Sequence, residues 1–138
     1  MPTPNPDAFR QSADHSRPVI TFAVALGDRP GRAFFGCSDF KVYEADLAAA
    51  KVEFKELHAT HQSYVTGVAF AAGAVISGAY DGKLVWWSAS ENRLVRTVDA
   101  HTKWVRKVIA SPDGTLVASV ADDMVCKLWN AQTGALVK

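Results

Sequence analysis

Short apolar runs separated by turn signals make up most of this chain. Runs of about four to eight residues bounded by Gly, Pro, Asn, Asp or Ser are typical of β-strands. Segment 46–51 has helical propensity, but it is too short to be a stable helix and is interpreted as a loop or single turn. The pattern predicts an all-β protein with strands at 19–26, 33–37, 40–43, 52–57, 65–72, 74–79, 83–88, 93–98, 105–110, 116–121, 125–129 and 135–138.

The pair Asp81-Gly82 lies between the apolar runs 74–76 and 84–87. An Asp-Gly dipeptide between apolar runs favours a two-residue type I′ turn, which needs a positive φ at both residues. The sequence therefore predicts two antiparallel strands joined by a tight turn. The spacing of this hairpin returns 42 residues later, where Trp129 takes the place of Trp87.

Five positions match between the two units at near-constant spacing. Each aspartate precedes its tryptophan by six residues, each serine precedes its aspartate by four, and each histidine has a valine four residues later with an aromatic residue before it. Four short strands in about forty residues, repeated, are typical of a propeller blade. The matched residues are His61, Ser77, Asp81 and Trp87, and then His101, Ser119, Asp123 and Trp129.

These units resemble WD repeats, the tryptophan–aspartate repeats of β-propellers. The resemblance implies that the four matched residues form a hydrogen-bonded tetrad: the aspartate accepts from the imidazole and from turn amides, and the serine links the imidazole to the indole N–H. The motif is not complete, because Thr60 and Ala100 replace the usual glycine before the histidine. Ser88 and Asn130 likewise replace the usual aspartate after the tryptophan.

Residues 15–58 form a further, degenerate unit. His15 keeps the valine four residues later, but Asp39 precedes Tyr43 by only four residues and Phe35 stands at the serine position. We expect a shortened turn and an incomplete tetrad in this unit. The predicted organisation is an extended segment at 1–14 followed by a partial propeller of three blades at about 15–58, 59–98 and 99–138.

Three blades are too few for a closed propeller, which has about four to eight. Because Lys138 aligns with Arg96, the last unit stops within its outer strand. Two hypotheses follow: the chain is the N-terminal part of a longer propeller, which we favour, or three-blade chains self-associate to close a ring. Under either hypothesis, residues 7–14 are candidates for an outer strand of another blade.

Composition and charge argue against several kinds of partner. The net charge of +1 creates no field that would attract nucleic acid or an anionic membrane. We see neither a signal peptide nor an apolar run of bilayer length. Cys37 and Cys126 lie too far apart in sequence to form a metal-type pair, and we interpret them as free thiols. We therefore expect a cytoplasmic protein that binds neither nucleic acid nor membrane.

The recurring serine, histidine and aspartate invite a hydrolase interpretation. Catalysis, however, needs one nucleophile, one base and one oxyanion pocket, whereas this set occurs twice at the same offsets with a tryptophan each time. We therefore interpret the tetrads as structural and predict no catalytic residue and no cofactor. His58 and His61 have a metal-like spacing, but the neighbouring sequence offers no suitable third ligand, so we predict no metal site.

The sequence favours a non-catalytic scaffold for protein–protein interaction. The resemblance implies that a protein or peptide partner docks on the face formed by strand entries and turns, and Tyr, Trp and Arg dominate interface energetics. Packing between blades is the competing role for some of these residues. The competing function is an enzyme or enzyme subunit whose propeller surrounds a small-molecule or cofactor site. The candidate partner-binding residues are Tyr64, Tyr80, Trp104, Arg106 and Asp122.

Overall fold

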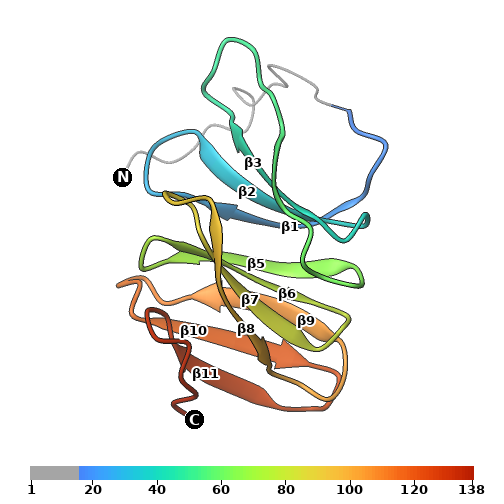
Figure 1. The fold of residues 1–138 in the computed structure, drawn as a ribbon, viewed down its shortest axis with the longest axis vertical. Helices are drawn as coiled ribbons and strands as arrows, with labels where there is room; N and C mark the ends of the chain where they lie inside the picture. The colour runs from blue at the N-terminus through green and yellow to red at the C-terminus, as the bar shows by residue number, and fades with distance from the viewer. Residues whose placement is uncertain (1–15) are drawn as a thin grey trace, which may run out of the picture.

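A computed structural model describes residues 16–138, which form three antiparallel sheets arranged one after another (Figure 1). The first sheet consists of β1 (Thr21–Leu26), β2 (Arg32–Cys37), β3 (Val42–Asp46) and β4 (Lys55–His58). The second consists of β5 (Val65–Ala71), β6 (Ala74–Ala79), β7 (Lys83–Ser88) and β8 (Arg93–Asp99). The third consists of β9 (Val105–Ala110), β10 (Leu116–Ala121) and β11 (Cys126–Asn130), with an isolated bridge between Trp129 and Leu136 at its outer side.

The predicted all-β fold of repeated antiparallel sheets is confirmed. Strands follow their sequence order across each sheet, so each sheet is a simple meander. The predicted strand at 135–138 is present as one bridge to β11 with flanking backbone hydrogen bonds, such as that from the Leu128 amide to the Lys138 carbonyl at 2.8 Å. The described part of the chain contains no helix long and apolar enough to span a membrane. The predicted N-terminal segment 1–14 and His15 lie outside the described residues.

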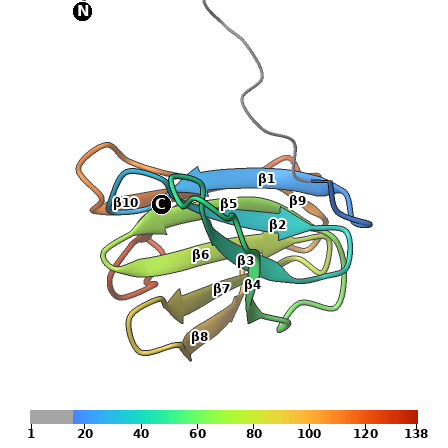
Figure 2. The same ribbon diagram turned by 90° about the horizontal axis from the view of Figure 1, so that it is seen from above.

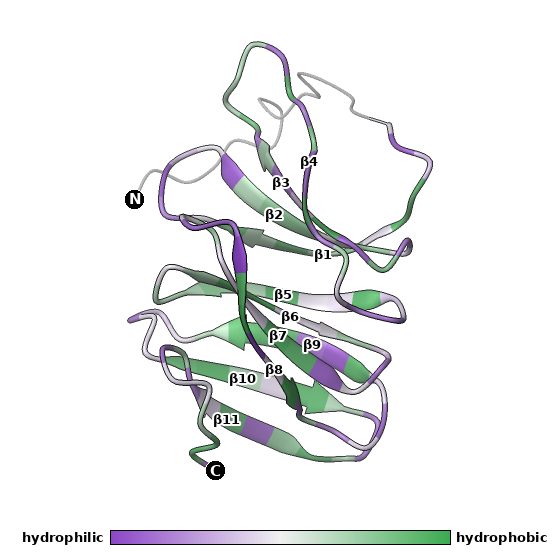
Figure 3. Cartoon of the chain, in the orientation of Figure 1, coloured by the Kyte–Doolittle hydropathy of each residue, from purple (hydrophilic) through white to green (hydrophobic). Residues whose placement is uncertain are grey.

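The strands β1, β5 and β9 lie side by side along one edge of the stack, and the later strands of each sheet extend away from it (Figure 2). Apolar side chains fill the two spaces between the sheets, and Figure 3 shows hydrophobic stretches on strands of all three sheets. Phe34 and Val68 are buried between the first and second sheets. Trp86 is buried between the second and third, and its indole N–H donates to the Ala131 carbonyl at 2.9 Å.

Glycine on the second strand of a sheet allows the next sheet to approach closely. A Cβ on Gly78 would lie 2.7 Å from Cγ2 of Val108, and a Cβ on Gly36 would lie 2.8 Å from Cγ1 of Val65. Both contacts are shorter than real Cβ atoms make, so a side chain does not fit at either position. Cross-strand pairing places Val120 at the corresponding position of the third sheet, where its side chain is 39% exposed.

The predicted two-residue type I′ turn at Asp81-Gly82 is wrong. The loop between β6 and β7 has three residues, and only Gly82 among them has a positive φ, of 78°. Such a loop, ending in a left-handed residue, is the next most common hairpin connection. The Gly82 amide donates to the Ala79 carbonyl at 3.1 Å and closes the turn, and the Asp81 carboxylate accepts a further hydrogen bond from the Lys83 amide at 3.0 Å.

The predicted shortened turn in the first unit is also wrong. Cross-strand pairs show that the loop between β2 and β3 has the same length as the loop between β6 and β7. Tyr43 therefore aligns with Val85 rather than with Trp87, and Ala45 occupies the tryptophan position. The sequence spacing is misleading because Tyr43 is not the equivalent of the tryptophan. Its hydroxyl instead donates to Asp39 in the turn.

Candidate protein-interaction face

The third sheet contains a complete hydrogen-bonded network. His101 Nδ1 lies 2.9 Å from Asp123 Oδ2, and its Nε2 lies 2.7 Å from Ser119 Oγ. The Trp129 indole N–H donates to the same serine oxygen at 2.9 Å. Burial alone would raise the pKa of Asp123, but hydrogen bonds from His101 and two backbone amides outweigh it and hold that pKa below its ordinary value. Each member is satisfied, so the network stabilises the turn and both adjoining strands.

The second sheet repeats only part of this network. His61 Nδ1 lies 3.0 Å from Asp81 Oδ2, and its Nε2 lies 2.9 Å from Ser77 Oγ. The predicted bond from Trp87 to Ser77 is wrong, because the Trp87 indole N–H is buried without a partner among the described residues. His58 takes its place: its Nε2 is 3.4 Å from Ser77 Oγ, and its ring stacks on Trp87 with centroids 5.0 Å apart.

His58 is a network member that sequence reasoning considered only as a metal ligand. It ends β4, so it connects the first sheet to a serine of the second. Burial lowers its pKa to about 3, with a further contribution from the charge of His61, so the ring is neutral at physiological pH. The available signal was a second histidine three residues before His61, with no histidine at the corresponding position before His101.

This geometry does not suit catalysis by the serines. Ser77 and Ser119 are both fully buried, and each hydroxyl contacts two side chains of its network. A substrate carbonyl cannot reach a hydroxyl placed in this way. The described residues also contain no group of three or more His, Cys, Asp or Glu side chains arranged to hold a metal ion.

Replacing each serine by alanine distinguishes the two networks by the stability that is lost. We expect Ser119→Ala to lower the free energy of unfolding by about 3 kcal/mol and Ser77→Ala by about 2 kcal/mol. The difference arises because Ser119→Ala leaves the buried Trp129 indole N–H without the acceptor that it binds at 2.9 Å, whereas Ser77→Ala loses only the longer contact of 3.4 Å to His58. Urea denaturation followed by tryptophan fluorescence measures both. Equal losses would contradict the different position of Trp87.

All five predicted partner-binding residues lie together on one face. The Tyr64 and Tyr80 rings are 5.8 Å apart, and Tyr80 stacks on Trp104 at 4.5 Å with an interplanar angle of 9°. The Arg106 guanidinium lies 5.0 Å from the Tyr80 ring centroid and 5.4 Å from that of Trp104. Arg106 also makes a bidentate pair with Asp122 at 2.7 and 2.6 Å and donates to the Tyr80 hydroxyl at 2.7 Å.

Sequence reasoning missed two further rings of this surface. Phe22 and Phe40 lie 5.5 and 5.7 Å from the Tyr64 ring. We call the five rings Phe22, Phe40, Tyr64, Tyr80 and Trp104 the aromatic row. It crosses all three sheets, and Phe22, Phe40, Tyr64 and Trp104 are each 40–50% exposed. The spacing of the repeat does not mark either phenylalanine. Phe40 lies in a turn, whereas the sequence predicts a strand there.

The repeat itself positions the row. Tyr64 and Trp104 directly precede β5 and β9, and Tyr80 and Asp122 directly follow β6 and β10. The Tyr80 amide donates to the Tyr64 carbonyl at 3.0 Å, and the Asp122 amide makes the same 3.0 Å bond to Trp104. Backbone hydrogen bonds therefore hold the aromatic residues in place in both sheets.

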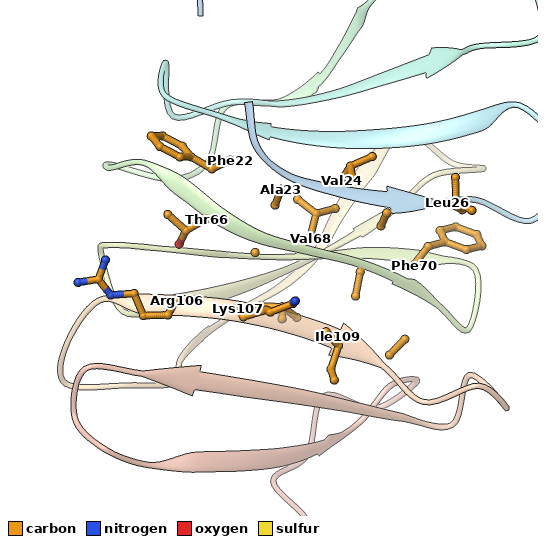
Figure 4. Close-up of a pocket in the computed structure, with 15 residues that line it drawn as sticks. Phe22, Ala23, Val24, Leu26, Thr66, Val68, Phe70, Arg106, Lys107 and Ile109 are labelled. Carbon is orange, nitrogen blue, oxygen red and sulfur yellow. The ribbon is translucent and has the colours of Figure 1, made fainter. Parts of the chain in front are cut away.

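A groove of about 530 Å³ lies along β1, β5 and β9 and adjoins the aromatic row at Phe22 (Figure 4). Its polar side chains are Thr66, Arg106 and Lys107, and the other lining side chains are apolar or glycine. The lining contains no carboxylate, histidine or cysteine.

Three antiparallel meanders packed along a common inner edge define a segment of a β-propeller. The solved structure of the RRP9 WD40 repeats has this fold. The two structures superpose with a TM-score of 0.78 at 15% sequence identity, and the match covers 90% of the present chain and 39% of the RRP9 chain. A family model for the WD domain, G-beta repeat, matches residues 92–130.

Two relatives extend this similarity. Nuclear distribution protein PAC1 of Arthroderma otae is 33% identical over an alignment of 129 residues, covering 84% of the chain and 27% of that protein. DDB1- and CUL4-associated factor 13 of Danio rerio is 37% identical over 70 residues, covering 51% of the chain and 16% of that protein. The chain belongs to the WD40-repeat family, which is typically non-catalytic. The chain spans about a quarter of the length of the PAC1 proteins that it matches.

Proposed function

We propose that the chain is a non-catalytic protein-interaction module of the cytoplasm that binds a peptide or a protein surface along the aromatic row. WD40 proteins generally bind proteins, which supports this class of function. The observation that carries the proposal is the contact between Tyr64, Tyr80, Trp104, Arg106 and Asp122 on one exposed face.

The row has the properties of an interface hot spot. Tyr, Trp and Arg supply most of the binding energy in protein interfaces, and four of the five predicted residues are of these types. Asp122 fixes the Arg106 guanidinium, which in turn lies against Tyr80 and Trp104. A surface that is already ordered loses little side-chain entropy when a partner binds, so rings held in this way favour affinity.

Trp104→Ala tests the proposal. The wild-type chain and the variant are used as baits to select from a displayed library of random twelve-residue peptides. We expect the wild type to enrich a set of related sequences and Trp104→Ala to bind a selected peptide at least about tenfold more weakly, because an interface tryptophan is typically worth more than 1.4 kcal/mol. Fluorescence anisotropy with the labelled peptide measures the affinity.

The matched control is Leu94→Ala on β8, which removes a side chain of similar exposure (43% against 50% for Trp104) away from the row. It should retain wild-type affinity, and unfolding curves must show both variants folded. If the wild type enriches no peptides beyond those of the Trp104→Ala bait, the aromatic row is not a peptide-binding surface.

A further inference from the structure

The chain enters the first sheet beside the aromatic row. The Ile20 amide donates to Ser38 Oγ at 3.0 Å, and the Ser38 amide donates to the Ile20 carbonyl at 2.9 Å. Ile20 lies two residues before Phe22. Ser38 likewise lies two residues before Phe40. These bonds therefore fix the entering backbone next to both phenylalanines of the row, and the residues that precede this point start within reach of it.

The first six residues of the sequence contain closely spaced prolines. They are Met-Pro-Thr-Pro-Asn-Pro, with a proline at every second position. Proline fixes its own φ near −65°, and it disfavours the α region at the residue before it. Alternate prolines therefore favour the polyproline II conformation, which has no internal hydrogen bonds and leaves its carbonyls free to accept.

The aromatic row has the chemistry and the length to bind such a segment. Polyproline II segments dock in grooves that are lined by aromatic side chains. Successive ring centroids between Phe22 and Trp104 are 5.5, 5.8 and 4.5 Å apart, so the row between them is at most about 16 Å long. Five residues of polyproline II cover about 15 Å. The exposed Tyr64 and Trp104 also carry donors, a hydroxyl and an indole N–H, that proline carbonyls can use.

The charges beside the row do not favour an ionic ligand. Arg106 pairs with Asp122 at the Trp104 end. The charge of Lys103 is offset by the Asp123 carboxylate at the same end. Residues 1–6 contain no charged side chain, so they match a surface of rings without excess charge.

The chain between the prolines and the row is long enough to let the segment turn back. Sixteen positions separate Pro6 from Phe22. An extended chain of this length reaches about 50 Å, which is about three times the length of the row. Figure 4 shows Phe22 and Arg106 at the same end of β1 and β9, so a segment that turns back at Phe22 can follow the row across the sheets.

We propose that residues 1–6 dock on the aromatic row of the same chain, with their prolines against the rings, and that the row is a site for proline-rich peptides. A partner segment of the same kind binds by displacing the chain's own. The tethered segment competes at a local concentration on the order of 1 mM, so it lowers the apparent affinity for a partner. The inference rests on the proposed function and narrows it to peptides that adopt polyproline II.

The NMR signals of the indole N–H groups test the internal contact in the full chain. We expect replacement of the three prolines by alanine to shift the Trp104 signal, because the segment no longer covers that ring, and to leave those of the buried Trp86 and Trp129 unchanged. The spectrum of Trp104→Phe assigns the signal. Pro30→Ala, at an exposed proline between β1 and β2, is the matched control and should shift none of them. An unchanged Trp104 signal would overturn the internal docking. The triple variant carries Pro2→Ala, Pro4→Ala and Pro6→Ala.

The random twelve-residue library provides the second test. We expect the wild-type bait to enrich peptides with two or more prolines, and the triple variant to bind a selected peptide about tenfold more tightly than the wild type, because the internal competitor is lost. Enriched peptides without proline would overturn the proline specificity and leave the proposed function standing. Equal affinities of the two chains would overturn the internal docking. Absence of any enrichment over the Trp104→Ala bait would instead remove the proposed function.

Discussion

Replacing Gly78 by valine is expected to lower the free energy of unfolding by about 3 kcal/mol. A Cβ at this position lies 2.7 Å from Val108 Cγ2 and 2.8 Å from Val105 Cγ1, and valine adds two methyl groups beyond it. Both facing valines are buried, at 2% and 0% exposure, so the third sheet must move away to relieve the overlap. Urea denaturation monitored by tryptophan fluorescence measures the loss.

The reverse change in the third sheet is the control. Val120 aligns with Gly78 but is partly exposed, so Val120→Gly costs only about 1 kcal/mol, from backbone entropy and a small loss of buried apolar area. A similar cost for the two substitutions would mean that the second and third sheets do not approach each other as closely as the structure shows.

The strands and the network of the third sheet follow from local sequence. Alternating apolar runs and the aspartate turns define each hairpin, and the offsets between Ser119, Asp123 and Trp129 are those of residues on paired antiparallel strands. The close approach of sheets at Gly78 has no local signal, because glycine in a strand also marks bulges and bends. The close approach can be recognised only in the structure, where Val105 and Val108 face Gly78.

The second network shows where local spacing stops being informative. The spacing of Ser77, Asp81 and Trp87 is identical to that of the third unit, yet Trp87 lacks the serine bond. The difference comes from His58, which belongs to the preceding sheet and reaches Ser77 across the interface. A contact between sheets depends on how they pack, and a repeat alignment contains no information about it. The candidate interaction face is the opposite case, because the repeat places its residues at equivalent strand ends.

His58 makes the stability of the fold depend on pH. Its pKa is about 3 in the folded state, against an ordinary value of 6.5, because burial disfavours the charged ring. Between these two values the unfolded chain binds a proton that the folded chain does not. Stability is therefore full above about pH 6.5 and falls as the pH decreases toward 3. Lowering the pH from 7.5 to 4.5 should remove about 2–3 kcal/mol through this residue.

The variant His58→Phe isolates this effect, because phenylalanine keeps a ring against Trp87 but does not titrate. The measurement is the free energy of unfolding in urea at pH 7.5, 6.5, 5.5 and 4.5. The series ends at pH 4.5 so that it does not include the titration of the two aspartates. The pKa values of Asp81 and Asp123 are held below the ordinary 3.8, so the stability that these carboxylates contribute is lost only at lower pH. We expect the variant to lose less stability than the wild type across this range. If both lose the same amount, His58 is not the residue that couples protonation to the interface between the first two sheets.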